Sequence, residues 1–229
     1  MLRIDIITLF PELFSAWMTS GINRRAFDLN LAEAVFWNPR DFAQGNYRRV
    51  DDRPYGGGPG MVMMAQPLAD AIQAAQARQA LHGVFNAPVV YLSAQGLPCS
   101  HAAVQAFSLA QGLIVLCGRY EGVDQRLIDR YVTAQVCVGD FVVSGGELPA
   151  MMVLDAALRL IPGVLNDCAS YQEDSFYTGG LDHPHFTRPE VFEGCGVPPV
   201  LLSGNHAHIA QWRAQQARAL TMAMRPDLL

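Results

Sequence analysis

Three short, almost wholly apolar segments in the middle of the chain constrain its fold most. They are Pro88–Leu92, Leu113–Cys117 and Gln135–Val143, and helical patterns at Ser100–Leu109 and Asp124–Tyr131 separate them. Strands that are apolar on both faces and alternate with helices are typical of parallel sheets covered on both sides. The sequence therefore predicts an α/β fold, with a parallel sheet and helices on both of its faces.

The flanking segments extend this pattern toward both ends. Leu2–Thr8 and Leu31–Trp37 have the composition of further strands, whereas Pro67–Leu81 and Leu148–Ile161 have helical periodicity. A long irregular stretch, Asn38–Gly60, interrupts the alternation and ends in a glycine-rich run. We expect this stretch to form a loop beside the sheet.

The pattern changes after Pro162. Residues 163–186 are polar, aromatic and glycine-bearing without a steady period, which is typical of a linker or a loop that carries function. A helix is then expected over Asn205–Met224, with Asn205 as its N-cap. The sequence thus predicts an α/β domain of residues 1–162, a linker and active-site loop of residues 163–186, and a small, mostly helical domain of residues 187–229.

Composition narrows the class of protein. The chain has 229 residues, of which 51% are hydrophobic and 16% charged, with a net charge of −5. Its apolar runs are too short to cross a bilayer, and Asp5 and Pro11 interrupt the apolar start, which therefore indicates a strand rather than a signal peptide. We expect a cytoplasmic protein with no membrane partner. A reducing compartment also suits its widely spaced cysteines, which form no CxxC pair: Cys99, Cys117, Cys137, Cys168 and Cys195.

The chain contains no lysine, so all 16 basic residues are arginines. This excludes enzymes that depend on a Schiff-base lysine, a Walker lysine or a kinase-type lysine. Two histidine pairs, His183/His185 and His206/His208, lack cysteine or histidine partners at zinc-like spacing. On spacing alone, a structural zinc site is not expected.

A loop rich in small or polar residues follows each of the three buried strands. These loops are Ser93–Gly96, Gly118–Gly122 and Ser144–Glu147. Because ligands of parallel α/β sheets bind at the carboxyl ends of strands, the loops are expected to converge on one pocket. No G-x-G-x-x-G occurs in them, and Pro59 removes an amide from the glycine-rich Gly56–Gly60. A phosphate-free ligand held by backbone groups therefore suits the pocket better than a nucleoside triphosphate.

Seven sequence blocks carry a resemblance to a known family. In chain order they are DDRPYGGGPGM (51–61), YLSAQG (91–96), CGRYEGVD (117–124), VGDFVVSGGELPAM (138–151), EDSF (173–176), HFTRPEV (185–191) and VPPVLLSGNH (197–206). Over nearly its whole length the chain resembles the bacterial tRNA (guanine-N1)-methyltransferases of the SPOUT superfamily. The resemblance implies a deep trefoil knot, a homodimer, and methyl transfer from S-adenosyl-L-methionine to N1 of the guanine 3′ of the tRNA anticodon.

Two alternatives remain beside this interpretation. One is a SPOUT methyltransferase that acts on another RNA position or base atom, and the other is a non-catalytic RNA-binding module with the same fold. The presence of both Asp174 and Arg159 disfavours the second, because a binding module needs no base.

The resemblance implies a cofactor site built from the same three loops. Two positions depart from the family pattern: Ala94 stands where proline is usual, and Phe141 where tyrosine is frequent. We expect small effects, since the family's cofactor contacts there are largely made by the backbone. The implied cofactor-binding residues are Tyr91, Leu92, Ser93, Gln95, Gly118, Tyr120, Glu121, Val138, Gly139, Asp140, Phe141, Val142, Val143, Gly145, Gly146 and Pro149.

The implied reaction sets further demands. N1 of guanine must lose its hydrogen as the methyl group arrives, while negative charge develops toward O6. The resemblance assigns the general base to Asp174 and the electrostatic partner of O6 to Arg159, with Glu173 and Asp182 as rival carboxylates. It also implies Mg²⁺ near Glu121 and Asp174.

The resemblance further implies how the partners meet. In the family, the C-terminal part of one protomer completes the site over the cofactor of the other, so we expect a homodimer with composite active sites. The tRNA substrate is expected to contact exposed basic and loop residues, although a merely solvated surface remains the alternative for the arginines. The candidates are Arg25, Tyr55, Gly58, Pro59, His185, Arg188 and Arg213.

Overall fold

A computed structural model describes residues 1–167 and 169–229 and divides the chain into two compact units. The N-terminal unit spans Met1–Asn166 and the C-terminal unit Asp167–Leu229. The change of sequence pattern at Pro162 therefore falls a few residues before the observed division. Cys168, one of the five cysteines, lies outside the described residues.

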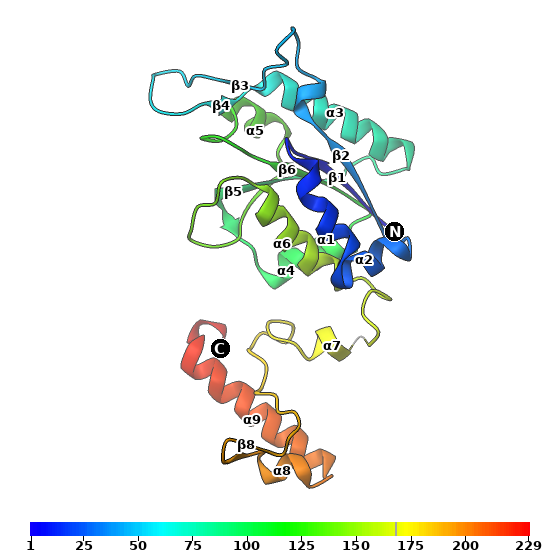
Figure 1. Cartoon of the computed structure of the whole chain (residues 1–229), viewed down its shortest axis with the longest axis vertical. Coiled ribbons are helices and arrows are strands. Elements are labelled where there is room, and N and C mark those ends of the chain that lie inside the picture. The colour runs from blue at the N-terminus through cyan, green and yellow to red at the C-terminus, as the bar shows by residue number, and fades with distance from the viewer. Residues whose placement is uncertain (168) are drawn as a thin grey trace. The chain divides into compact units, whose positions relative to one another are not determined.

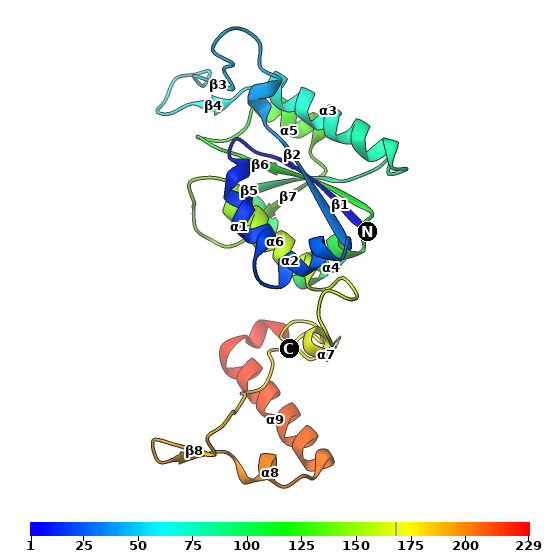
Figure 2. The same cartoon turned by 45° about the vertical axis from the view of Figure 1, so that its right-hand side comes forward.

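The N-terminal unit is built on a five-stranded sheet in which every pair of neighbouring strands is parallel. The strand order is β2-β1-β6-β5-β7, and Figure 2 shows the strands side by side between two layers of helices. This confirms the predicted parallel α/β fold, whereas the trefoil knot stays a prediction. The strands are β1 (Leu2–Ile7), β2 (Ala32–Trp37), β5 (Val89–Pro98), β6 (Gly112–Cys117) and β7 (Ala134–Cys137).

Helices cover both faces of the sheet, as predicted (Figure 1). One face is covered by α3 (Ala65–Leu81) and α5 (Gln125–Tyr131). The opposite face is covered by the 3-10 helix η1 (Pro11–Phe14) and by α1 (Ser15–Thr19), α2 (Gly21–Asp28), α4 (His101–Leu109) and α6 (Glu147–Leu158).

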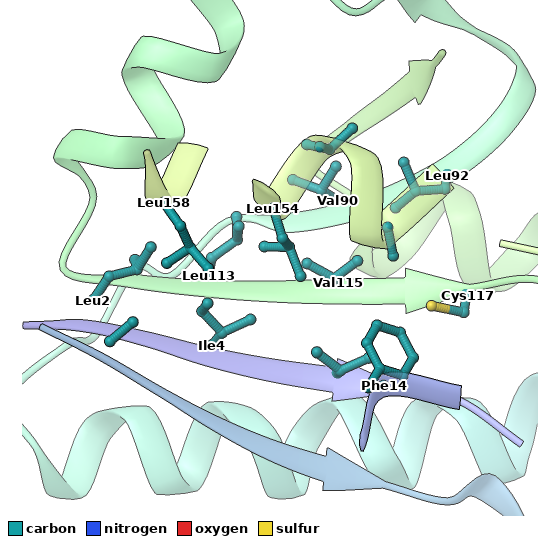
Figure 3. Close-up of a cluster of buried hydrophobic side chains, with 14 of the residues drawn as sticks. Leu2, Ile4, Phe14, Val90, Leu92, Leu113, Val115, Cys117, Leu154 and Leu158 are labelled. Carbon is teal, nitrogen blue, oxygen red and sulfur yellow. The ribbon is translucent and has the colours of Figure 1, made fainter. Parts of the chain in front are cut away.

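Strand β6 lies at the centre of the sheet because both of its faces are apolar. Leu113, Val115 and Cys117 point to the face covered by α6, and Figure 3 shows Leu113 and Val115 beside Leu158 and Leu154 of that helix. The intervening residues of β6 point to the other face, where α3 and α5 pack. A strand that is buried on both sides can only be an interior strand, which is why its continuous apolar run was informative.

Strands β5 and β7 differ from the predicted segments. The predicted strand Gln135–Val143 ends at Cys137, and the chain then turns, with the amide of Phe141 donating to the carbonyl oxygen of Gly139 at 2.9 Å. Strand β5 is longer than predicted, because the expected loop Ser93–Gly96 lies inside it as a shift of register between Leu92 and Leu97. Apolar composition alone therefore misjudged where both strands end.

The predicted helices are present, with small shifts at their ends. The helix expected over Leu148–Ile161 is α6, which ends at Leu158. Three side chains cap helices by accepting backbone N–H groups: Ser100 at α4, Asp124 at α5 and Asn205 at α9 (His206–Met224). The predicted N-cap of the C-terminal helix is thus confirmed.

The stretch predicted to be irregular, Asn38–Gly60, contains only short elements. They are the 3-10 helix η2 (Pro39–Asp41) and the strand β3 (Asp51–Asp52), which pairs antiparallel with β4 (Val62–Met63). The glycine-rich run forms the exposed loop between these two strands.

The C-terminal unit is mostly helical, as predicted. Its short hairpin was not predicted, because two-residue strands carry no period. None of the described helices is long and apolar enough to span a membrane. The elements are α7 (Ala169–Gln172), β8 (Val191–Phe192), β9 (Cys195–Gly196), α8 (Pro199–Leu202), α9 and the 3-10 helix η3 (Pro226–Leu228).

The substitution Leu154→Ala should destabilise the N-terminal unit by about 2–5 kcal/mol, because it leaves a cavity between α6 and β6. Leu148→Ala on the same helix is the matched control, since that side chain is exposed and should cost at most about 0.5 kcal/mol. Urea unfolding of both variants measures the difference. Equal midpoints would contradict the packing of α6 described above.

Candidate active site

A cavity of about 340 Å³ lies beside the register shift of β5 and the carboxyl ends of β6 and β7. The shifted segment of β5 and the segments that follow β6 and β7 line it, so the three segments that the sequence predicted to converge do meet, although the first is not a loop after its strand. All of the residues named above for the cofactor line this cavity except Asp140, which is exposed beside it. The chain thus brings together segments more than fifty residues apart in sequence.

The register shift in β5 forms one wall of the cavity. Tyr91 is buried, and this burial raises the pKa of its phenol, so that the group is neutral at physiological pH. Ser93 accepts the backbone N–H of Gln95 at 3.1 Å, which holds the bulged segment in a turn. This wall is therefore a neutral surface with hydrogen-bonding groups.

The loop after β6 forms the second wall. Its backbone turns sharply, with positive φ at Tyr120 (59°) and at Gly122 (133°). The carbonyl oxygen of Met61 accepts the Glu121 amide at 2.9 Å, and the Gly122 carbonyl accepts the Met63 amide at 2.9 Å, so β4 holds the loop. Burial and the nearby Asp51 carboxylate raise the pKa of Tyr120, which is likewise neutral.

The third wall is the segment from β7 to α6, which approaches β6 closely. The amide of Gly146 donates to the carbonyl oxygen of Gly118 at 2.8 Å. A Cβ atom at Gly146 would lie 2.8 Å from Cα of Cys117 and 2.9 Å from the Gly118 nitrogen, both of which are rigid backbone atoms. Only glycine permits this contact between the second and third walls.

An ion pair between Arg119, which lines the cavity, and the buried Glu147 was not predicted. Glu147, which is 1% exposed, lies in the first turn of α6, and its Oε2 is 2.9 Å from Nε of Arg119. Its Oε1 accepts the hydroxyl of Thr8 at 2.8 Å. Arg119 also donates to the carbonyl oxygen of Ser144 at 3.2 Å and lies over the ring of Phe10, 4.5 Å from its centroid.

This pair links three parts of the site: the end of β1, the loop after β6 and the start of α6. Glu147 and Arg119 both lie in loops that the sequence singled out, but nothing in their spacing marked them as partners. Glu147 also helps burial to raise the pKa of Cys117 well above its usual range, so that this thiol is unreactive.

The two predicted catalytic residues lie in different units. Arg159 is half-buried at the C-cap of α6, where the helix dipole favours a cation. Asp174 is half-buried in the C-terminal unit, and its Oδ1 accepts the backbone N–H of Ser175 at 2.8 Å.

Asp174 lies in a second cavity, of about 480 Å³, within the C-terminal unit. Both rival carboxylates, Glu173 and Asp182, line the same cavity, so geometry keeps them as alternatives. The remaining lining residues are Asp167, Ser170, His183 and His185. Glu121, the other predicted metal ligand, belongs to the first cavity and packs its side chain against Gly60.

The candidate RNA contacts are mostly exposed. Tyr55 is 99% exposed, and Gly58 and Pro59 are exposed beside it in the loop between β3 and β4. Arg25 instead donates to the carbonyl oxygen of Gly163 at 3.2 Å and to the side chain of Asn166, so it ties α2 to the end of the N-terminal unit. In the C-terminal unit, the exposed candidates are His185, Arg188 and Arg213.

The substitution Glu147→Gln should lower the free energy of unfolding by about 3 kcal/mol, because it leaves the Arg119 charge buried without its counterion. Asp28→Asn is the control: its pair with Arg24 spans 3.2 Å but is largely exposed, and should contribute less than about 1 kcal/mol. Denaturant unfolding measures both. A loss no larger for Glu147→Gln than for Asp28→Asn would show that the buried pair does not hold the loops.

Comparison with known proteins identifies the family. The family profile described as tRNA (Guanine-1)-methyltransferase TrmD matches residues 2–229. A tRNA (guanine-N(1)-)-methyltransferase of Chromobacterium violaceum is 56% identical over 228 residues, which cover 100% of this chain and 89% of that protein. Proteins of the same name from Albidiferax ferrireducens and Polaromonas sp. are 56% and 54% identical over 231 residues, covering 92% and 89% of their lengths. The chain therefore belongs to the tRNA (guanine-1)-methyltransferase family.

Proposed function

We propose that this chain is the enzyme that transfers a methyl group from S-adenosyl-L-methionine to N1 of the guanine 3′ of the anticodon in tRNA. The observation that carries the proposal is the cavity beside the register shift of β5 and the ends of β6 and β7, lined by the segments that the family blocks occupy. Membership of a family of tRNA (guanine-1)-methyltransferases supplies the reaction class.

The first cavity fits the cofactor in size and in chemistry. Its volume of about 340 Å³ lies within the range of small-molecule sites, which combine apolar walls with a few polar groups. Leu92, Val138 and Val142 offer aliphatic surface, while close-packed glycines leave backbone N–H and C=O groups accessible to a ligand. When bound, S-adenosylmethionine supplies the methyl group as an electrophile.

The chain's own residues handle the proton and the charge. Asp174 takes the N1 proton of guanine as the bond from N1 to the methyl carbon forms and the bond from sulfur to that carbon breaks. Arg159 stabilises the negative charge that develops on O6. Glu173 and Asp182 line the same cavity as Asp174 and are the residues to test if Asp174 is not the base.

Magnesium belongs to the proposal as a second cofactor. Hard cations prefer oxygen ligands, and four carboxylates line the cavity of Asp174: Asp167, Glu173, Asp174 and Asp182. Glu121 presents a further carboxylate at the first cavity. The proposal assigns the magnesium ion to Asp174 and Glu121, whose carboxylates are oxygen donors of the kind that this ion prefers.

A homodimer with composite sites accounts for the assignment of the catalytic residues to two different units. The cofactor cavity and Arg159 belong to the N-terminal unit, whereas Asp174 belongs to the C-terminal unit. In a twofold dimer, the C-terminal unit of one protomer completes the site over the cofactor of its partner. The domain of residues 187–229 then recognises tRNA, together with the exposed loop at Tyr55. We place this tRNA-modifying enzyme in the cytoplasm.

Methylation of unmodified tRNA transcripts with labelled S-adenosylmethionine tests the function. The expected product nucleoside is 1-methylguanosine at the position 3′ of the anticodon. Methyl on another atom or at another position would favour a different SPOUT methyltransferase. RNA binding without any transfer would favour the non-catalytic module.

The substitution Asp174→Ala should lower the single-turnover rate of methyl transfer by roughly 10²–10⁴, the usual contribution of a positioned general base. Its affinity for S-adenosylmethionine, measured by calorimetry, should stay unchanged, because the cofactor cavity lies in the other unit. Glu173→Ala is the matched control at the neighbouring carboxylate. A rate within a few-fold of wild type for Asp174→Ala would transfer the role of base to Glu173 or Asp182.

Mixing two inactive variants tests the composite site. Gly146→Val should abolish cofactor binding because its side chain collides with the backbone of Cys117, whereas Gly196→Val, at a position open to solvent, controls for folding. Random exchange of Asp174→Ala and Gly146→Val chains makes half of the dimers mixed, each with one intact site. Activity should therefore recover to roughly a quarter of wild type, by the twofold symmetry. Mixed dimers without activity, verified by mass, would place both residues in the site of one chain.

A further inference from the structure

Three metal-ligating side chains of the C-terminal unit converge at one edge of the second cavity. They are Asp182, His183 and His185, and their ligand atoms all lie within 4.8 Å of one another. Nε2 of His185 is 2.8 Å from Oδ2 of Asp182, and Nε2 of His183 is 3.7 Å from Oδ1 of the same carboxylate. The histidine pair that seemed to lack a metal-binding partner in sequence therefore shares a neighbouring aspartate in space.

These separations are close to those around a small metal ion. Ligand atoms about 2.0–2.2 Å from a tetrahedral zinc ion stand about 3.3–3.6 Å from each other. The two histidine–carboxylate separations, 2.8 Å to Oδ2 and 3.7 Å to Oδ1, lie on either side of this range, and one ligand atom from each of the three residues lies within 4.8 Å of the others. Side-chain adjustment on binding would bring the three atoms into one coordination sphere.

The surrounding contacts preorganise the ligands. Nδ1 of His183 is 3.1 Å from the carbonyl oxygen of Pro184, which fixes the tautomer whose Nε2 carries the free lone pair. This is the second-shell arrangement that metal-bound histidines commonly have. The hydroxyl oxygen of Ser175 accepts the amide of Asp182 at 3.0 Å and so holds the backbone of the carboxylate ligand.

We infer that Asp182, His183 and His185 form a binding site for a divalent transition ion of the zinc class. Two imidazole nitrogens and one carboxylate oxygen are a ligand set that suits Zn²⁺, Co²⁺ or Fe²⁺, whereas Mg²⁺ demands oxygen ligands. The ion displaces the proton that His185 and Asp182 share and coordinates both in its place. This site is thus distinct in its chemistry from the magnesium proposed at Glu121 and Asp174.

Three protein ligands leave the ion with open positions toward the cavity. Structural zinc sites use four protein ligands. A site with three protein ligands keeps a water molecule or another exchangeable ligand in the fourth position. The cavity side carries Glu173 and Asp174, which can hydrogen-bond to such a water. The ion therefore binds reversibly beside the proposed base and is not required for the fold.

Titration of the full chain with Zn²⁺ and with Co²⁺ tests the site. A Cys168→Ser/Cys195→Ser background removes two competing thiols. We expect one ion per chain by calorimetry, visible d–d absorption bands on Co²⁺ binding, and no displacement by millimolar Mg²⁺. His183→Ala, His185→Ala and Asp182→Asn should each weaken Zn²⁺ binding by at least roughly tenfold, since each removes a ligand.

The double variant His206→Ala/His208→Ala is the matched control. This exposed pair at the start of α9 has the same spacing, but among the described residues it forms no metal-ligating cluster with a carboxylate. Its Zn²⁺ affinity should equal that of the background chain. Equal affinities in all variants, or Co²⁺ binding without d–d bands, would overturn the inference and leave a plain histidine–aspartate hydrogen bond. Thermal unfolding curves verify that each variant is folded. These readouts do not involve methyl transfer, so the inference and the proposed function fail independently.

Discussion

The first cavity depends on one buried ion pair. A carboxylate that is 1% exposed is costly unless it is paired, and Glu147 is paired with Arg119 and hydrogen-bonded to Thr8. Glu147 belongs to α6, Arg119 to the loop after β6 and Thr8 to the end of β1. If one of these elements moved away, the Glu147 carboxylate would lose a partner, and the free-energy cost of the unpaired charge opposes that movement. Arg119 further holds the carbonyl oxygen of Ser144, which lies in the segment that forms the third wall. A polar network thus shapes a site that side-chain packing alone would leave loose.

The close contact between Gly146 and the end of β6 complements the ion pair. Backbone atoms there approach to distances that any side chain would prevent. The backbones of the second and third walls are consequently close together with no side chain between them. A ligand can therefore reach their N–H and C=O groups. Gly118 and Gly146 are needed for van der Waals space and not for unusual dihedral angles, since neither has a positive φ, in contrast to Gly122.

The sequence predicted the sheet better than the edges of the site. Strand β6 was predicted within one residue, because a run buried on both faces has few alternatives. Strand β7 was predicted six residues too long, since Val142 and Val143 are apolar yet 87% and 38% exposed, where they line the cavity. Apolar residues that serve a ligand cannot be distinguished by composition from those that serve the core. The roles of Arg159 and Asp174 came from the resemblance alone, because a cation at the end of a helix is common and the irregular segment around Asp174 carries no period.

The two units differ in the chemistry that they offer. Burial keeps Tyr91, Tyr120 and Cys117 protonated around the first cavity, and Arg119 neutralises Glu147 behind it. Among the residues described as lining that cavity, Glu121 is the only carboxylate, so the N-terminal unit offers little capacity to accept a proton. Four carboxylates and two histidines instead gather in the cavity of the C-terminal unit. A reaction that must remove a proton from guanine while a methyl group arrives needs both environments. This division of chemistry between the units is the physical reason to expect that neither is active without the other.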